Sequence, residues 1–280
     1  MLKRNYYSLR TGKIVPNEDL SFEILKKHFL IIYNRLEKED YFQKYYGFDC
    51  VDAPDFNWGE LGSDIETVYF INLKKYNLYP IPPNLADYTE DDLFDVIEFL
   101  HDTCSKGISG HFHSWNNCGY HYEEFSDNEG QKYFRDLMNP ILKDYSTGFE
   151  VSINGEILTM PDEGLTNLFD ADIPSKDTEN ITYKINNAKL KFRRYKSTLE
   201  DRREAIRELA DVLEFLRPQI KGTLSKQDEG DLFNIANNFG IRHHNSNQKT
   251  EYDKPIWYSW MFYYYLATLH ALLRMIEKNK

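Results

Sequence analysis

The sequence predicts a mainly α protein of the α+β class, with an α-rich N-terminal domain that carries a small β-hairpin and a C-terminal antiparallel four-helix bundle. Over most of the chain, apolar residues recur every three to four positions, as in amphipathic helices. Residues 148–160 (GFEVSINGEILTM) instead alternate around Asn154-Gly155, which predicts a type I′ hairpin. A turn-rich acidic segment follows, so the 280 residues divide into domains 1–165 and 166–280.

Four helices are expected in the N-terminal domain. Leu20–Lys38 has apolar residues at helical spacing, and a second helix begins near Ser63. Thr89 is an N-cap followed by acidic residues, which predicts a helix over the stretch EDDLFDVIEFLHD. Residues 126–146 form a further helix, which we expect Pro140 to interrupt.

The C-terminal domain contains four helical segments, at 181–197, 199–217, 226–239 and 254–278. Thr198 and Ser225 are the predicted N-caps of the second and third segments, and Pro218 and Gly240 are their predicted stops. Short connections favour antiparallel neighbours, hence the bundle. The last segment is aromatic nearly all round, so we expect it to be buried on every side, against the N-terminal domain or a second copy in a homodimer.

Composition and charge restrict the function classes. The formal net charge of −11 is unevenly distributed: residues 1–170 carry 15 Lys+Arg and 30 Asp+Glu, whereas residues 171–280 carry 19 and 15. Only the second half is therefore a candidate surface for a nucleic-acid backbone. Three cysteines without framework spacing indicate a reducing, cytoplasmic location. The apolar run Ile256–Leu273 contains several tyrosines, which favours a packed helix over a membrane span.

Six metal-ligating side chains fall within 21 residues of the N-terminal domain. They are His101, Cys104, His111, His113, Cys118 and His121. Zinc takes four nitrogen or sulfur ligands, and close pairs across a loop are a common source of them. The sequence therefore indicates a structural zinc site. Two alternatives remain, a metal-free recognition pocket lined by the histidines and plain structural roles for all six residues.

A second polar cluster, Arg242, His243, His244 and Asn245, follows the third segment of the bundle. Arginine presents a fixed fork of donors to phosphate oxygens, and histidine moves protons near neutral pH. These groups suit RNA cleavage without a metal, with Asn238 orienting a histidine or holding the backbone. The alternatives are a structural helix–loop junction and a ligand-binding site.

Four further basic side chains are candidates for contact with RNA phosphates. Arg193, Arg194 and Lys196 lie in the stretch KLKFRRYKS, and Lys249 follows the second cluster. The alternative for the stretch is a solvated helix face whose charges pair with the acids of LEDRREAIRE.

Several blocks carry a resemblance to a known family. They are YYSLRTGKI, GFDCVD, GELGSDIE, DDLFDVIEFLHD, CGYHYEEF, GFEVSINGEI, LEDRREAIRELADVLEFLRP and DLFNIANNFGIRHHN with QKTEYDKPIWYSWMFYYYLATLHALLR. The chain resembles the bacterial abortive-infection AbiJ-type N-terminal domain family, and its C-terminal part resembles the HEPN superfamily. The resemblance implies a cytoplasmic antiphage effector, dimeric and acting on RNA without a metal. A phage component or an antitoxin is the implied partner.

The HEPN catalytic pattern is an arginine followed, after four to six residues, by a histidine. Arg242 matches the arginine, whereas positions 247–249 hold Asn247, Gln248 and Lys249. Two interpretations follow from the resemblance. Either His243 or His244 serves a variant endoribonuclease site, or the HEPN-like unit is non-catalytic and binds a nucleotide, RNA or protein partner.

Overall fold

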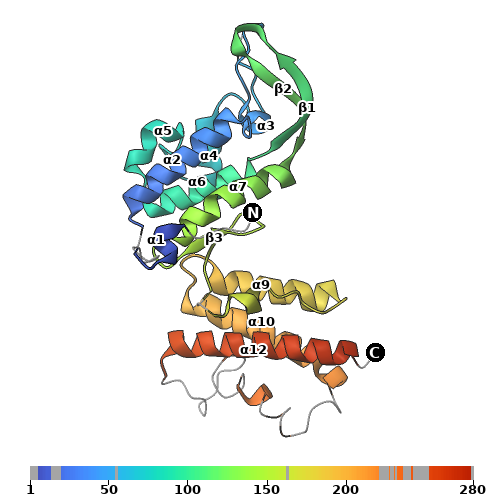
Figure 1. Cartoon of the computed structure of the whole chain (residues 1–280). Coiled ribbons are helices and arrows are strands. Elements are labelled where there is room, and N and C mark those ends of the chain that lie inside the picture. Colours follow the sequence, from blue (N-terminus) through green and yellow to red (C-terminus); the bar gives the residue numbers. More distant parts are fainter. Residues whose placement is uncertain are drawn as a thin grey trace. The chain divides into compact units, whose positions relative to one another are not determined.

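The computed structural model describes residues 6–13, 20–53, 56–161, 164–220, 227, 230, 232–235, 241 and 252–278. These residues are mainly helical and contain two two-stranded sheets, as the α+β prediction requires. The chain forms two compact units, Met1–Leu158 and Thr159–Lys280 (Figure 1). The division falls in the small hairpin, a few residues before the predicted boundary. None of the described helices has the length and apolar character needed to cross a membrane.

The first unit is a helical body with a β-ribbon. Its elements are α1 (Tyr7–Arg10), α2 (Phe22–Lys38), α3 (Gln43–Tyr46), α4 (Ile65–Leu73), α5 (Ile81–Asn84), η1 (Leu85–Asp87), α6 (Glu90–Asp102), β1 (Lys106–His113), η2 (Trp115–Asn117), β2 (Gly119–Ser126), α7 (Asp127–Lys143), β3 (Phe149–Val151) and β4 (Ile157–Thr159). Helices α2 and α6 both pack on α7, and their apolar faces supply much of the core. The predicted cap of α6 is confirmed, because Thr89 and Asp92 form a capping box.

A helix begins near Ser63, as predicted: Asp64 caps α4, and its carboxylate accepts the backbone N–H of Thr67 at 3.1 Å. The predicted interruption at Pro140 is wrong, because helix α7 runs through this residue. The proline lies in the last turn, where its missing N–H removes one hydrogen bond close to the point at which the helix ends in any case.

Strands β1 and β2 form an antiparallel ribbon that curves away from the helices of the first unit (Figure 1). The pairing runs from Lys106 opposite Ser126 to His113 opposite Gly119, and it sets His111 across from His121. The sequence pattern did not predict this sheet. Most of β1 is exposed, so its sequence lacks the alternation of apolar and polar residues that marks a half-buried strand.

The predicted hairpin at 148–160 is confirmed as the pair β3–β4, but its turn is not type I′. A type I′ turn needs positive φ at both central residues, and here Gly155 has φ +89° while Asn154 is not in the left-handed region. The Gly155 N–H donates to the Ser152 carbonyl, and the Ser152 N–H donates to the Glu156 carbonyl. The loop therefore has three residues, with Gly155 in the left-handed position.

The elements that begin in the described part of the second unit are all helical. Its elements are α8 (Thr166–Asp170), the π-helical turn η3 (Thr178–Thr182), α9 (Tyr183–Arg193), α10 (Leu199–Ile220) and α12 (Lys254–Lys278). Helix α10 packs against both α9 and α12, and the rings of Phe192 and Phe262 stack at 4.0 Å between centroids. Helix α10 continues through Pro218, so the predicted stop there is wrong.

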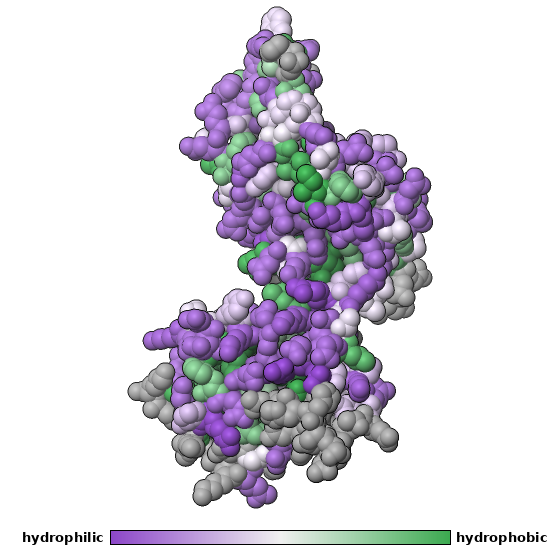
Figure 2. Space-filling model, turned by 180° about the vertical axis from the view of Figure 1, so that it is seen from behind, coloured by the Kyte–Doolittle hydropathy of each residue, from purple (hydrophilic) through white to green (hydrophobic). Residues whose placement is uncertain are grey.

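Three of the four predicted bundle helices are thus present, as α9, α10 and α12. Of the third predicted segment, 226–239, residues 227, 230 and 232–235 are described and helical. The four-helix bundle as a whole remains a prediction. Helix α12 is not buried on every side by the described residues, because Trp257 and Trp260 are both partly exposed. Hydrophilic residues cover most of the visible face of each unit, with small hydrophobic groups between them (Figure 2).

Candidate metal centre

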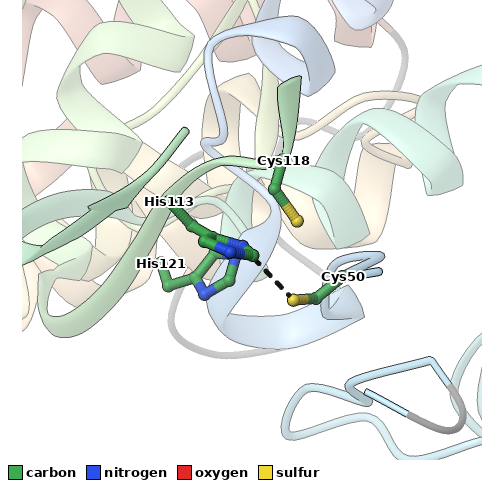
Figure 3. A group of neighbouring side chains, drawn as sticks. All are labelled: Cys50, His113, Cys118 and His121. Carbon is green, nitrogen blue, oxygen red and sulfur yellow. Dashed lines mark hydrogen bonds between the residues drawn. The ribbon is translucent and has the colours of Figure 1, made fainter. Parts of the chain in front are cut away.

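Four side chains converge where the β1–β2 ribbon meets the loop after α3 (Figure 3). Cys50 lies in that loop, His113 ends β1, Cys118 is in the turn that follows, and His121 lies on β2. One ligand atom from each lies within 4.8 Å of the others. Two sulfurs and two imidazole nitrogens are a donor set that zinc prefers. The prediction of a metal site in this region is therefore supported by the geometry of the side chains.

Helix α3 is joined to the ribbon by one side chain. The Gln43 amide donates from Nε2 to the Tyr120 carbonyl at 2.8 Å and accepts at Oε1 from the Tyr122 N–H at 2.7 Å. Gln43 is buried, so these bonds are shielded from water. They hold β2 against the helix from which the Cys50 loop departs.

The loop itself is shaped at Gly47 and Phe48. Gly47 has φ +93°, and a Cβ at this position would lie 2.0 Å from the Asn57 carbonyl oxygen, so only glycine fits. Phe48 and Asn57 then exchange two backbone hydrogen bonds of 3.0 and 3.1 Å. This bridge turns the chain so that Cys50 faces the ribbon.

The distance between Cys50 and His113 matches that between two ligands of one metal ion. Cys50 Sγ lies 3.6 Å from His113 Nδ1. In a tetrahedron with metal–ligand bonds of 2.0–2.3 Å, neighbouring donors are about 3.5 Å apart. On the other side of the ring, His113 Nε2 lies 3.0 Å from Asp52 Oδ2. A carboxylate behind a ligating histidine fixes the tautomer and makes the imidazole a stronger ligand.

His121 presents an unsatisfied nitrogen to the same place. Its Nε2 is buried and has no hydrogen-bond partner within the described part of the chain. The ring packs against Phe48 at 4.4 Å between centroids. Burial lowers the pKa of His121, and the neighbouring His111 and His113 lower it further. The imidazole is therefore held neutral, which is the form that ligates a metal.

The fourth donor, Cys118, is half-buried. Its Sγ donates a weak hydrogen bond to the Asp49 carbonyl at 3.5 Å. Burial raises the pKa of the Cys118 thiol, and the nearby Cys50 sulfur adds to this effect. A cation between the two sulfurs would favour their thiolate forms. The unpartnered nitrogen of His121 and the paired sulfurs both fit a metal ion.

Three of the six predicted ligands lie in this cluster and three do not. His101 is buried in the core, where its Nε2 contacts Arg135 at 2.7 Å. Cys104 is buried as well, burial raises the pKa of its thiol to about 12, and its Sγ donates to the Gly130 carbonyl. His111 is exposed and pairs with Glu123 at 3.4 Å.

Sequence reasoning missed Cys50, which is 63 residues from His113. A signal for it was present. The pair Cys118 and His121 has the spacing of two zinc ligands and requires further donors, and Cys50 is the remaining cysteine outside the 101–121 stretch.

The structure describes only some of the residues that were predicted to contact or cleave RNA. Arg193 is buried, and its Nε donates to the Thr159 carbonyl at 2.8 Å, so its guanidinium has a structural role. Arg194 and Lys196 are exposed. The predicted residues outside the described part of the chain are Asn238, Arg242, His243, His244, Asn245 and Lys249. Ile241, which precedes Arg242, is fully buried in the helical core.

Comparison of the chain with known proteins gave no match to a protein family, to a curated protein or to a solved structure.

Proposed function

We propose that the first unit is a zinc-stabilised recognition module and that the second unit is an RNA-cleaving effector, in a protein of bacterial antiviral defence. One observation carries the first half of the proposal. The ligand atoms of Cys50, His113, Cys118 and His121 lie within 4.8 Å of one another. Structural zinc sites use four protein ligands and leave no position for a substrate. The ion would therefore stabilise the unit and take no part in chemistry.

The recognition role is supported by what the zinc would hold in place. The ion would fasten the loop after α3 to the β1–β2 ribbon. Near this end of the ribbon, three large aromatic side chains are exposed, Phe112 by 62%, Trp115 by 71% and Tyr120 by 45%. Exposed aromatics on a rigid element are favourable anchors for a protein partner. A phage component or an antitoxin would bind this surface.

Metal analysis of the purified protein tests the zinc proposal. We expect one zinc per chain, lost when Cys50 or Cys118 is replaced by serine. His111→Gln is the matched control, because His111 borders the cluster but is exposed and paired with Glu123. Wild type that remains free of zinc after refolding with zinc under reducing conditions would contradict the proposal.

The effector role rests on the resemblance to HEPN ribonucleases. Arg242 would stabilise phosphate charge, and His243 or His244 would transfer the proton.

Cleavage of total RNA and tRNA tests the effector role. The wild type is compared with Arg242→Ala and with a His243→Ala/His244→Ala double variant, in magnesium-free buffer with and without EDTA. The arm without chelator preserves the zinc, so loss of fold is separated from loss of catalysis. Cleavage by wild type alone supports the ribonuclease. RNA binding without cleavage supports the second candidate, a non-catalytic HEPN-like module.

A further inference from the structure

Beside the metal centre, the first unit contains a cavity of about 500 Å³ lined by fourteen residues. Seven of these lining residues are aromatic, three are acidic, and none is lysine or arginine. The volume lies within the range of small-molecule sites. Phe48 and Cys118 form part of the wall, so the cavity borders the metal centre. An aromatic, acidic cavity without a basic residue of its own has the composition of a site for a cation.

Some of the aromatic rings that line the cavity are buried, and others are exposed at its opening. Tyr33, Phe42 and Tyr46 are buried, and the centroid of the Phe42 ring lies 5.5 Å from each of the other two. At the rim, Phe56 and Trp58 are 37% and 50% exposed, with their centroids 4.6 Å apart. The face of an aromatic ring carries partial negative charge and attracts an organic cation, most strongly in the case of tryptophan.

The three carboxylates add full negative charge to the same cavity. They belong to Glu37, Asp40 and Asp49. Asp40 is half-buried and makes no ion pair with any residue in the described part of the chain, and burial raises the pKa of its carboxyl. Lys44, which is next to the lining, directs its ammonium to Asp127 at 2.7 Å. The negative charge of Asp40 is thus left without a described cation.

Asp40, which lines the cavity, has a left-handed backbone conformation. It has φ +61°, a conformation that aspartate and asparagine adopt more readily than most residues. Its N–H donates to the Glu37 carbonyl, and its carbonyl accepts from the Gln43 N–H. These bonds join the end of α2 to α3 and fix the backbone of Asp40 before a ligand arrives, which lowers the entropy cost of binding.

We propose that this cavity binds an organic cation, an ammonium or guanidinium group carried by a small molecule or by a peptide side chain. The site is separate from the zinc proposal, because its aromatic and acidic groups are not the metal donors. It would give the recognition module a defined ligand chemistry.

Calorimetric titration with charged and neutral isosteres tests the proposal. Choline and its neutral isostere 3,3-dimethyl-1-butanol probe the small-molecule source. The peptide acetyl-Gly-Arg-Gly-amide and its citrulline counterpart probe the side-chain source. We expect at least one cation to bind about tenfold more tightly than its neutral isostere. The proposal is overturned when neither cation binds at millimolar concentrations, or when charged and neutral ligands bind equally.

Variants of two residues that line the cavity test whether the cation binds there. Asp40→Asn removes the charge and tolerates the left-handed backbone, and Trp58→Leu removes one aromatic face at an exposed position. Each should weaken cation binding about tenfold. Glu66→Gln and Tyr76→Leu are the controls, since both residues are exposed and neither lines the cavity. Equal affinity in the test and control variants would overturn the site.

Zinc content is measured in every sample, so that failure of the cation-site proposal can be distinguished from failure of the zinc proposal. If the protein holds zinc but binds choline and the arginine peptide no more tightly than their neutral isosteres, only the cation-site proposal is overturned. A chain that binds the cation with Asp40 and Trp58 dependence, yet never holds zinc, supports the cation site and contradicts the zinc-stabilised module.

Discussion

The Asp52 carboxylate contacts His113 on the side of the imidazole ring that faces away from Cys50. Asp52 Oδ2 lies 3.0 Å from His113 Nε2, while Nδ1 of the same ring lies 3.6 Å from the Cys50 sulfur. The carboxylate therefore holds the Nε2–H tautomer, which leaves the Nδ1 lone pair directed toward the other donors. Asp52 is 71% exposed at its side chain, so it can hold this tautomer without being part of the core.

The first prediction concerns this pair. Asp52→Asn keeps an oxygen that can accept from His113 but removes the negative charge. We expect zinc affinity to fall by about 10–100-fold, as for other changes behind a ligating histidine. Competition with a chromogenic chelator measures the affinity, and Asp87→Asn serves as a control on an exposed acid remote in the sequence. Unchanged affinity in Asp52→Asn would show that the carboxylate has no influence on the metal.

The second prediction concerns removal of the metal. A ligand that binds only the folded state stabilises it by about 2.7 kcal/mol when its concentration is 100 times its Kd. We expect EDTA to lower the unfolding temperature of the wild type and added zinc to restore it. The Cys118→Ser variant should unfold at the lower temperature with or without zinc, whereas His111→Gln should follow the wild type. Scanning calorimetry checks this, and an unfolding temperature independent of both additions would contradict a structural role.

The third prediction concerns pH. Glu98 is partly buried and accepts the Ile157 N–H at 2.6 Å. Burial raises the pKa of the Glu98 carboxyl, and nearby acids such as Glu156 raise it further, although the Ile157 bond opposes the shift. A carboxyl whose pKa is higher in the folded state destabilises the fold once it ionises. This loss of folding stability is absent at low pH and grows as the pH rises toward the raised pKa.

We therefore expect Glu98→Gln, which retains an acceptor for Ile157, to unfold about 2–4 °C above the wild type at neutral pH. The difference should vanish at about pH 3, more than one unit below the unfolded pKa of about 4.3, where the wild-type carboxyl is protonated in both states. Unfolding temperatures measured across this range check the sign. A variant that is less stable than the wild type at neutral pH would mean that the ionised hydrogen bond outweighs the burial.

The fourth prediction compares two glycines with positive φ. At Gly155 a Cβ would lie 2.7 Å from His101 Nδ1 and 2.9 Å from Asp102 Oδ1, whereas at Gly62 a Cβ would meet nothing within 4 Å. Alanine at Gly62 should cost only the backbone penalty, about 1–2 kcal/mol. Alanine at Gly155 should cost about 3 kcal/mol or more, because the steric conflict adds to that penalty. Urea unfolding of both variants measures the difference, and equal costs would show that the hairpin moves freely away from α6.

Periodicity and capping predicted the helices because those signals are local. The Thr89 cap and the apolar spacing of Leu20–Lys38 each depend on residues within one or two turns, and both helices are present. Proline signals were less reliable. The helix continues through both Pro140 and Pro218. Pro140 lies in the last turn of α7, where few bonds are lost.

The metal centre depends on contacts that no local pattern contains. His113, Cys118 and His121 are close in sequence, and their residue types predicted a site. Cys50 joins them only because Gln43 fastens α3 to β2 and because Gly47 turns the loop. His101 and Cys104 had equally suitable chemistry, but the apolar face of α6 carries them into the core.

The separation of Cys50 and His113 by 63 residues has a consequence for the chain before it folds. A nascent chain cannot complete the centre until His121 has been synthesised, by which time the sequences of α4, α5 and α6 are already made. An ion bound by all four donors would then close those helices into one large ring. Closing a ring of this length removes conformational freedom mainly from the unfolded chain. An unfolded chain would have to lose that freedom in order to hold the ion, so zinc should bind the folded unit far more tightly than the chain in urea.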